Sequence, residues 1–212
     1  AGFVFGCRSN GFEVTGKTVL ILGSGGAARA IAAALCEAGV GQLTIANRNL
    51  ANAQQLVDLL VTDGGYGFVT SLNDMISKNR AGKAVVSVPK GARIMPPVMI
   101  PETASTLYLA AISNEGRMLV FPLSELPELA KGKGNKIISI PSARVQNREE
   151  YVVAVAVFGE EDQLEVKAGK RKLGLRFGDL EHYLGERGRR GHKLPRGLQR
   201  VDGIDVIPSA AR

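Results

Sequence analysis

The residues best suited to chemistry form a glycine-rich turn near the start of the chain. Residues 23–28, GSGGAA, follow the spacing G-x-G-x-x-A. The first glycine of this pattern permits a tight turn, the second lets the backbone approach a pyrophosphate, and the final alanine lets a helix pack close to the preceding strand. An arginine at the end of the next strand, as at position 48, neutralises the 2′-phosphate of NADP, whereas an acid would favour NAD. The predicted cofactor is therefore NADP, and its predicted ligands are Gly23, Ser24, Gly25, Gly26, Ala27, Asn47 and Arg48.

Four elements would have to position this turn. The apolar run Val19–Leu22 predicts a buried parallel strand, and the alanine-rich run Ala27–Ala38 predicts a helix. Leu43–Ala46 predicts a second strand, and Ala51–Leu60 predicts a second helix. This order is that of a partial Rossmann-like β-α-β-α fragment at residues 1–58. The alternative is a β-α-β turn of the same shape that holds no ligand.

This fragment resembles the cofactor half of the shikimate and quinate dehydrogenases. The resemblance is carried by AGFVFG at residues 1–6, GKTVLILGSGGAARA at 16–30 and IANRN at 45–49. The family usually has threonine after the Asn-Arg pair, where this chain has Asn49. The resemblance implies an NADP-binding fold. It does not imply hydride transfer, because the family's catalytic Lys and Asp belong to a substrate domain that precedes the matched region.

Basic residues form a second set suited to binding. Loops that combine glycine with lysine or arginine recur at Asn79–Lys83, Lys131–Lys136 and Arg187–Gly191. Residues 1–58 carry four Lys/Arg against three Asp/Glu, whereas residues 59–212 carry 23 against 17. Basic side chains at regular intervals along one rim would neutralise successive phosphates of a nucleic acid, and loop glycines would let backbone amides approach them. The alternative for any single loop is a solvated surface turn.

The basic loops recur because the sequence itself repeats. Thr62–Met75 aligns with Ser113–Leu126 at an offset of 51, and Ala84–Pro89 aligns with Lys136–Pro141 at an offset of 52. Each copy predicts a strand, a glycine turn, a return strand and a basic loop. A period of about 50 residues is typical of stacked or radially arranged β units.

A third and weaker copy follows. Phe177–Leu180 matches Leu123–Leu126 at an offset of 54, and Gly188 matches Gly134 at the same offset. The prediction is an all-β domain of about three repeats at residues 59–207, followed by a short tail at 208–212.

Residues 59–207 resemble the C-terminal domain of the A subunit of bacterial DNA topoisomerase IV. The matching segments are GYGFVTSLNDMISKNRAGKA at 65–84, EGRMLVFPLSELPELAKGKGNKIISIPSA at 115–143, AGKRKLGLR at 168–176 and GERGRRGHKLPRGLQRVD at 185–202. In that family the domain is a β-pinwheel, a relative of the β-propeller, whose basic outer rim binds and bends DNA. The resemblance implies a partial β-pinwheel here, and no cofactor is required for its DNA binding.

The resemblance and the loops together predict the residues that contact DNA. They are Arg80, Lys83, Lys131, Lys133, Lys136, Lys170, Arg171, Lys172, Arg187, Arg189, Arg190, Lys193 and Arg196. The implied partner is double-stranded DNA and, in the whole enzyme of that family, the B subunit of topoisomerase IV and a second A subunit. The strand-cleaving tyrosine of the family belongs to another domain, so this chain is not expected to be an enzyme by itself.

Composition narrows the remaining classes. The chain has 212 residues, a formal net charge of +7 and two cysteines without C-x-x-C spacing. No apolar run approaches the ~20 residues that a membrane span needs, so no membrane association is expected. His182 and His192 lack neighbouring ligands at metal-binding spacing, so no metal site is predicted. The expected location is the bacterial cytoplasm, at the nucleoid.

Taken together, the sequence predicts a chimera of two unrelated pieces. The leading functional hypothesis is DNA binding and bending by residues 59–207. The alternatives are a remnant of an NADP-dependent shikimate or quinate dehydrogenase, or a fusion without function.

Overall fold

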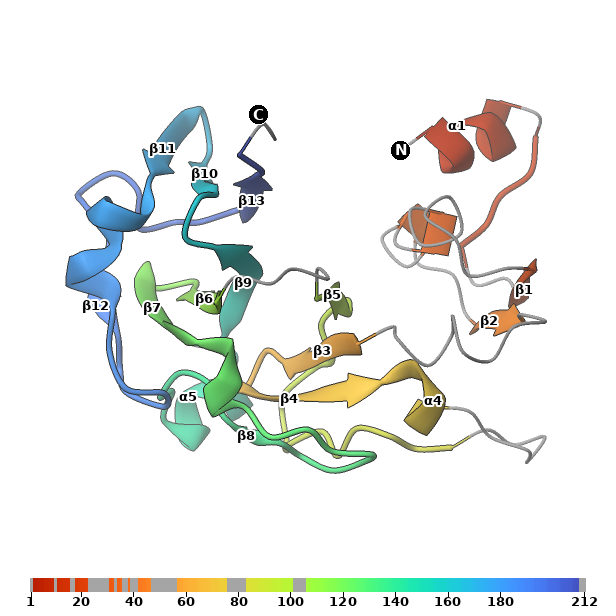
Figure 1. Ribbon diagram of the computed structural model, residues 1–212, viewed down its shortest axis with the longest axis horizontal. Coiled ribbons are helices and arrows are strands. Elements are labelled where there is room, and N and C mark those ends of the chain that lie inside the picture. The colour runs from red at the N-terminus through yellow and green to blue at the C-terminus, as the bar shows by residue number, and fades with distance from the viewer. Residues whose placement is uncertain are drawn as a thin grey trace. The chain divides into compact units, whose positions relative to one another are not determined.

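A computed structural model describes residues 2–9, 11–15, 18–22, 31, 32, 34, 35, 38, 42–46, 57–75, 83–100 and 106–209. The chain divides into two compact units, Ala1–Leu56 and Val57–Arg212, whose elements are labelled in Figure 1. The boundary predicted between residues 58 and 59 falls inside the first strand of the second unit.

The first unit contains a parallel pair of strands. β1 (Thr18–Leu22) pairs with β2 (Gln42–Ala46), residue by residue along their whole length. A parallel pair needs a crossover connection, and residues 31, 32, 34 and 35 between the two strands are helical. The helix α1 (Gly2–Ser9) precedes β1. A small apolar cluster holds this unit together and contains Val4, Val14, Ala34 and Leu35.

The helix predicted at Ala51–Leu60 is wrong for its last four residues. Residues 57–60 begin the strand β3 (Val57–Thr62), while residues 51–56 lie outside the described residues. Leu59, Leu60 and Val61 are all buried in this strand. A short, continuously apolar run that is buried on both faces has no periodicity that separates strand from helix.

The second unit is built from three antiparallel sheets within its described residues. The first has the order β5-β3-β4-β8, the second β9-β6-β7-β12 and the third β13-β10-β11. The strands are β4 (Tyr66–Ser71), β5 (Val98–Met99), β6 (Leu107–Ser113), β7 (Arg117–Pro122), β8 (Asn135–Lys136), β9 (Val152–Gly159), β10 (Gln163–Ala168), β11 (Arg171–Leu175), β12 (His192–Lys193) and β13 (Gly203–Ile207).

Each sheet contains the same hairpin. The hairpins β3–β4, β6–β7 and β10–β11 turn at Gly65, Gly116 and Gly169, whose φ angles of 81°, 67° and 59° favour glycine. A helical turn follows each return strand: α4 (Leu72–Met75), η1 (Leu123–Glu125) and η2 (Phe177–Tyr183). The predicted order of strand, glycine turn and return strand therefore describes all three repeats. A further short helix, α5 (Ser142–Gln146), lies between β8 and β9.

Alternating residues of β6 face different sheets, which explains the apolar run at residues 109–112. Leu109 and Ala111 belong to a core shared with Leu59 and Val61 of the first sheet. Ala110 and Ile112 belong to a second core, shared with residues of the third sheet. Because side chains of a strand point to opposite faces in turn, the middle sheet is covered on both sides, and residues 109–112 of its inner strand β6 are all apolar and buried.

Consecutive repeats are joined by exchanged strands. β8 lies in the basic loop of the second repeat but pairs with β4 of the first, and β12 of the third repeat pairs with β7 of the second. In Figure 1, β8, β12 and β11 lie along the outer side of this unit, whereas β5, β9 and β13 lie along its inner side. The short outer strand of the first and second sheets is thus supplied by the next repeat.

The exchanged strands also correct the register of the third repeat. Gly134 and Gly191 precede β8 and β12 directly, with φ angles of 75° and 70°. A Cβ atom would collide with the carbonyl oxygen of Gly67 in the first case and would meet that of Met118 at 2.6 Å in the second. Gly191, and not Gly188 as predicted, is therefore the structural equivalent of Gly134, because the third loop is three residues longer at this point.

Candidate nucleic-acid interface

Two of the three predicted basic loops occupy equivalent places on the outer side of the second unit. The loop of the second repeat lies alongside β4 of the first repeat. Leu129 N–H donates to Val69 O at 2.8 Å, and Ile137 N–H donates to Gly65 O at 2.7 Å. The loop of the third repeat lies alongside β7 in the same way, because Gly185 N–H donates to Val120 O and Leu194 N–H donates to Gly116 O. Both loops therefore lie at the free edge of a hairpin, one repeat apart.

The loop of the second repeat presents three lysines, Lys131, Lys133 and Lys136, at its surface. Lys131 and Lys133 are exposed and Lys136 is half-buried, and no carboxylate is bonded to these lysines in the described part of the chain. The Lys133 ammonium lies 3.8 Å from the centroid of the Tyr66 ring, and the Lys136 ammonium lies 5.7 Å from it. The ring orients these cations while leaving their charge uncompensated.

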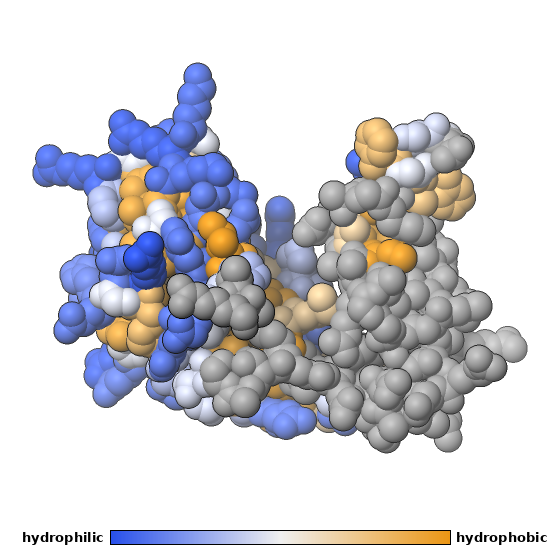
Figure 2. All heavy atoms as spheres, turned by 45° about the horizontal axis from the view of Figure 1, so that its top comes forward, coloured by the Kyte–Doolittle hydropathy of each residue, from blue (hydrophilic) through white to orange (hydrophobic). Residues whose placement is uncertain are grey.

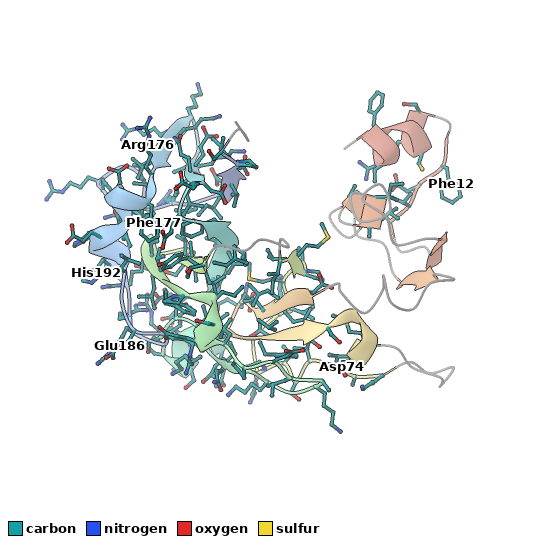
Figure 3. All side chains as sticks on the ribbon, viewed as in Figure 1. Phe12, Asp74, Arg176, Phe177, Glu186 and His192 are labelled. Carbon is teal, nitrogen blue, oxygen red and sulfur yellow. The ribbon has the colours of Figure 1, made fainter. Side chains whose placement is uncertain are left out.

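The arginines of the third loop form hydrogen bonds and ion pairs within the protein. Arg187 donates to Lys136 O at 2.8 Å, and Arg189 pairs with Glu186 at 2.7 Å on the exposed outer side (Figure 3). Arg190 donates to Glu150 at 2.6 Å through both terminal nitrogens. Lys193 and Arg196, further along the same segment, are exposed.

Glu150 is the centre of a buried charge cluster that sequence reasoning missed. Its side chain has no exposed surface and accepts hydrogen bonds from Arg190, Arg144 and Ser113. Burial opposes the charge of Glu150, but the bond to Arg190 and the charges of Arg190 and Arg144 outweigh burial and lower the pKa of Glu150 below its ordinary value. Arg190 thereby fastens the third repeat to the second. A buried acid has no signature in one sequence when its partners lie 6 and 40 residues away.

The basic run on β11 divides between different surroundings. Lys170 in the turn is exposed, and Lys172 forms an ion pair with Glu165 at 2.9 Å. The Arg171 guanidinium lies against Gly197, where a Cβ atom would collide with it. Arg171 and Lys172 are neighbours in a strand, so their side chains leave opposite faces of the sheet.

The first loop is only partly described. Arg80 lies outside the described residues. Lys83 is exposed, and its ammonium donates to Asp74 O at 2.7 Å, at the end of α4. Lys83 is thus the one predicted contact of this loop whose position is given.

The seven residues predicted to bind NADP, Gly23, Ser24, Gly25, Gly26, Ala27, Asn47 and Arg48, all lie outside the described residues. NADP binding therefore stays a prediction. Among the residues that the structure describes, no group of three or more His, Cys, Asp or Glu side chains could hold a metal ion. His182 and His192 are exposed on the second unit, with ring centroids 4.5 Å apart. In the described ranges no helix is long and apolar enough to cross a membrane.

Known relatives match the second unit closely. The chain is 51% identical over 152 residues to the A subunit of DNA topoisomerase 4 from Pseudomonas aeruginosa, and 50% identical over 148 residues to the Escherichia coli K12 protein. The solved structure of the E. coli ParC C-terminal domain aligns with a TM-score of 0.67 and 47% identity over 73% of this chain and 62% of that one. The second unit resembles the C-terminal domain of the topoisomerase IV A subunit. The predicted resemblance is confirmed.

More distant comparisons agree on the fold of the second unit, Val57–Arg212, which we call the topoisomerase-like unit. The DNA gyrase C-terminal domain family, a beta-propeller, matches residues 107–158. The structure of a DNA gyrase A C-terminal domain aligns with a TM-score of 0.56 at 14% identity, over 73% of this chain and 50% of that one. The predicted propeller-like β fold is therefore confirmed for the topoisomerase-like unit. The chain spans about a fifth of the length of the topoisomerase relatives. The match to the P. aeruginosa protein covers 71% of this chain and 20% of that protein.

The first unit has a different relative. The shikimate / quinate 5-dehydrogenase family matches residues 8–87, which include the glycine-rich turn. This match confirms the resemblance and extends it beyond the predicted limit at residue 58. The added residues, 59–87, include most of β3 and all of β4, which form an antiparallel hairpin in the topoisomerase-like unit.

Proposed function

We propose that the topoisomerase-like unit binds double-stranded DNA along its outer side. One observation carries this proposal: two basic loops lie at the edges of successive hairpins in the same way, through β8 on β4 and β12 on β7. Cations repeated along one side match the repeated phosphates of a duplex. The similarity to subunits of DNA topoisomerase 4, an enzyme named for acting on DNA, supports the same partner.

Internal bonding ranks the predicted contacts by how readily each could reach a phosphate. Glu150 has no exposed surface, so Arg190 cannot leave it for a phosphate without removing two of the hydrogen bonds that stabilise a buried charge. Arg189 and Lys172 are bound to acids on the surface, and such pairs are worth little, so they can exchange a carboxylate for a phosphate. Among the residues that the structure describes, seven of the predicted cations are bonded neither to an acid nor, as Lys83 and Arg187 are, to a backbone carbonyl. These are the proposed primary contacts: Lys131, Lys133, Lys136, Lys170, Arg171, Lys193 and Arg196.

The proposed binding depends little on base sequence. The described loops place flexible lysine and arginine side chains at a sheet edge and offer no helix that could enter a major groove. In Figure 2, hydrophilic side chains cover much of the visible surface of this unit. A duplex that follows successive loops would also have to bend. By similarity to the relatives, the proposal includes association with the B subunit of topoisomerase IV and with a second A subunit. The proposed location is the cytoplasm, at the nucleoid.

A salt titration of duplex binding tests the proposal. If about five phosphates are neutralised, the slope of log K against log salt will be about −4.5, which is roughly a 500-fold loss of affinity between ~50 and ~200 mM salt. Fluorescence anisotropy with labelled duplexes of unrelated sequence measures both the slope and the sequence tolerance. Affinity that does not change with ionic strength would contradict phosphate binding.

A further inference from the structure

One residue in the middle repeat shows what a complete junction between repeats looks like. Ile137 is buried, and its N–H donates to Gly65 O of the preceding repeat at 2.7 Å. Its carbonyl accepts from Gly188 N–H of the following repeat at 2.9 Å. Ile137 therefore bonds to both neighbouring repeats through its backbone.

The equivalent residues of the outer repeats bond on one side only. Val85 accepts from Gly132 N–H at 2.8 Å, but its own N–H has no partner among the described residues. Leu194 donates to Gly116 O at 2.8 Å, but its carbonyl has no partner in the same part of the chain. The unit thus ends in two unfinished junctions of opposite kind.

The return strands show the same asymmetry. β4 is covered by β8, and β7 is covered by β12. β11 pairs with β10 alone within residues 106–209, so its outer edge carries no strand. Lys172 of β11 is equivalent to Gly67 of β4 and Met118 of β7, because each lies five residues before the start of the helical turn that follows its strand. Its backbone N–H and C=O therefore point to the open edge, alternating with residues that bond β10.

The other end of the unit holds a segment of the kind that this edge lacks. By the 52-residue offset, Lys83–Ala84 corresponds to β8, which is Asn135–Lys136. Lys83 and Ala84 are exposed and belong to no strand. In Figure 1 the end of the unit at α4, where Lys83 is bound, lies opposite the end at β11. The two ends of one chain are therefore not placed to join each other.

We propose that the chain associates head to tail with a second copy of itself, Lys83–Val85 of one copy extending the β11 edge of the other. The contact repeats a junction that the fold already makes twice, at β4–β8 and β7–β12. Unpaired strand edges are templates for such pairing, and an association of unlike surfaces continues from copy to copy. The inference does not depend on DNA binding.

Sedimentation velocity of the full chain over a roughly hundredfold range of concentration tests this association. We expect the mass to rise beyond that of one chain as concentration increases. Lys172→Pro removes the outward N–H of the β11 edge and should abolish the rise, whereas Lys172→Ala keeps that N–H and should not. Val85→Pro should abolish it from the other end, with Val85→Ala as its control. Circular dichroism and the melting temperature establish that each variant is folded.

Mixing the two proline variants gives the decisive result. Lys172→Pro keeps the Lys83–Val85 segment intact, and Val85→Pro keeps the β11 edge intact, so the mixture should form pairs and nothing larger. Each variant alone should stay a single chain. The proposal is overturned if the wild-type chain is monomeric at every concentration, or if both proline variants associate as the wild type does.

Discussion

Arg190→Ala is expected to lower the free energy of unfolding of the topoisomerase-like unit by roughly 3 kcal/mol, the scale for breaking a buried ion pair. Glu150 has no exposed surface, and Arg190 supplies two of its hydrogen bonds, both at 2.6 Å. After the substitution, Arg144 and Ser113 alone remain to stabilise the buried charge. Urea unfolding followed by circular dichroism measures the change.

The neighbouring Arg189 is the matched control. Its ion pair with Glu186 leaves the two side chains 72% and 78% exposed, so Arg189→Ala should change stability by less than about 0.5 kcal/mol. Both variants remove one positive charge from the same loop. Equal effects of the two substitutions would show that Glu150 does not depend on Arg190.

The same carboxyl predicts how stability changes with pH. The pKa of Glu150 is lowered in the folded chain, although burial alone would raise it, because Arg190 and Arg144 favour its charged form. The unfolded chain therefore binds a proton more readily than the folded one, and stability is lost as the pH falls from the ordinary value of 4.5 through the folded pKa. Glu150→Gln should lose this part of the acid dependence. An unchanged acid profile in that variant would contradict the lowered pKa.

Reversing Lys131 and Lys133 together should weaken duplex binding at least about 30-fold and reduce the salt slope by about 2, since each lost phosphate contact removes about 0.9 from the slope. These lysines have no acidic partner in the part of the chain that the structure describes, and Lys133 is oriented by the Tyr66 ring. Their replacement by glutamate should therefore leave the fold intact. Anisotropy titrations at several salt concentrations provide both numbers.

A double reversal in the first unit separates position from net charge. Arg8→Glu with Lys17→Glu changes the formal charge by the same amount, but neither residue belongs to the topoisomerase-like unit. This control should retain nearly wild-type affinity. If both double variants lose affinity equally, binding follows the overall charge of the chain, and the outer loops are not the interface.

Local features were predictable where the signal lay in neighbouring residues. Gly65 and Gly116 mark hairpin turns because a positive φ is costly for other residues, and their strands are where the repeat predicts them. The helix predicted through Leu60 failed, since burial of Leu59 and Leu60 on both faces erases the strand pattern. The prediction that Gly188 matches Gly134 was wrong because the third loop differs in length. Only the pairing of β12 with β7 of the second repeat reveals the shift.

The sequence by itself determined that the chain joins two unlike pieces, that the second piece repeats, and that its basic loops recur with the repeat. These properties reside in composition and spacing. Only the tertiary structure decided that β8 and β12 each belong to the sheet of the preceding repeat, that Arg190 bonds to Glu150, and that β11 pairs with β10 alone within residues 106–209. Such pairings join backbone and side-chain groups far apart in the chain, so their energies depend on which segments meet in space.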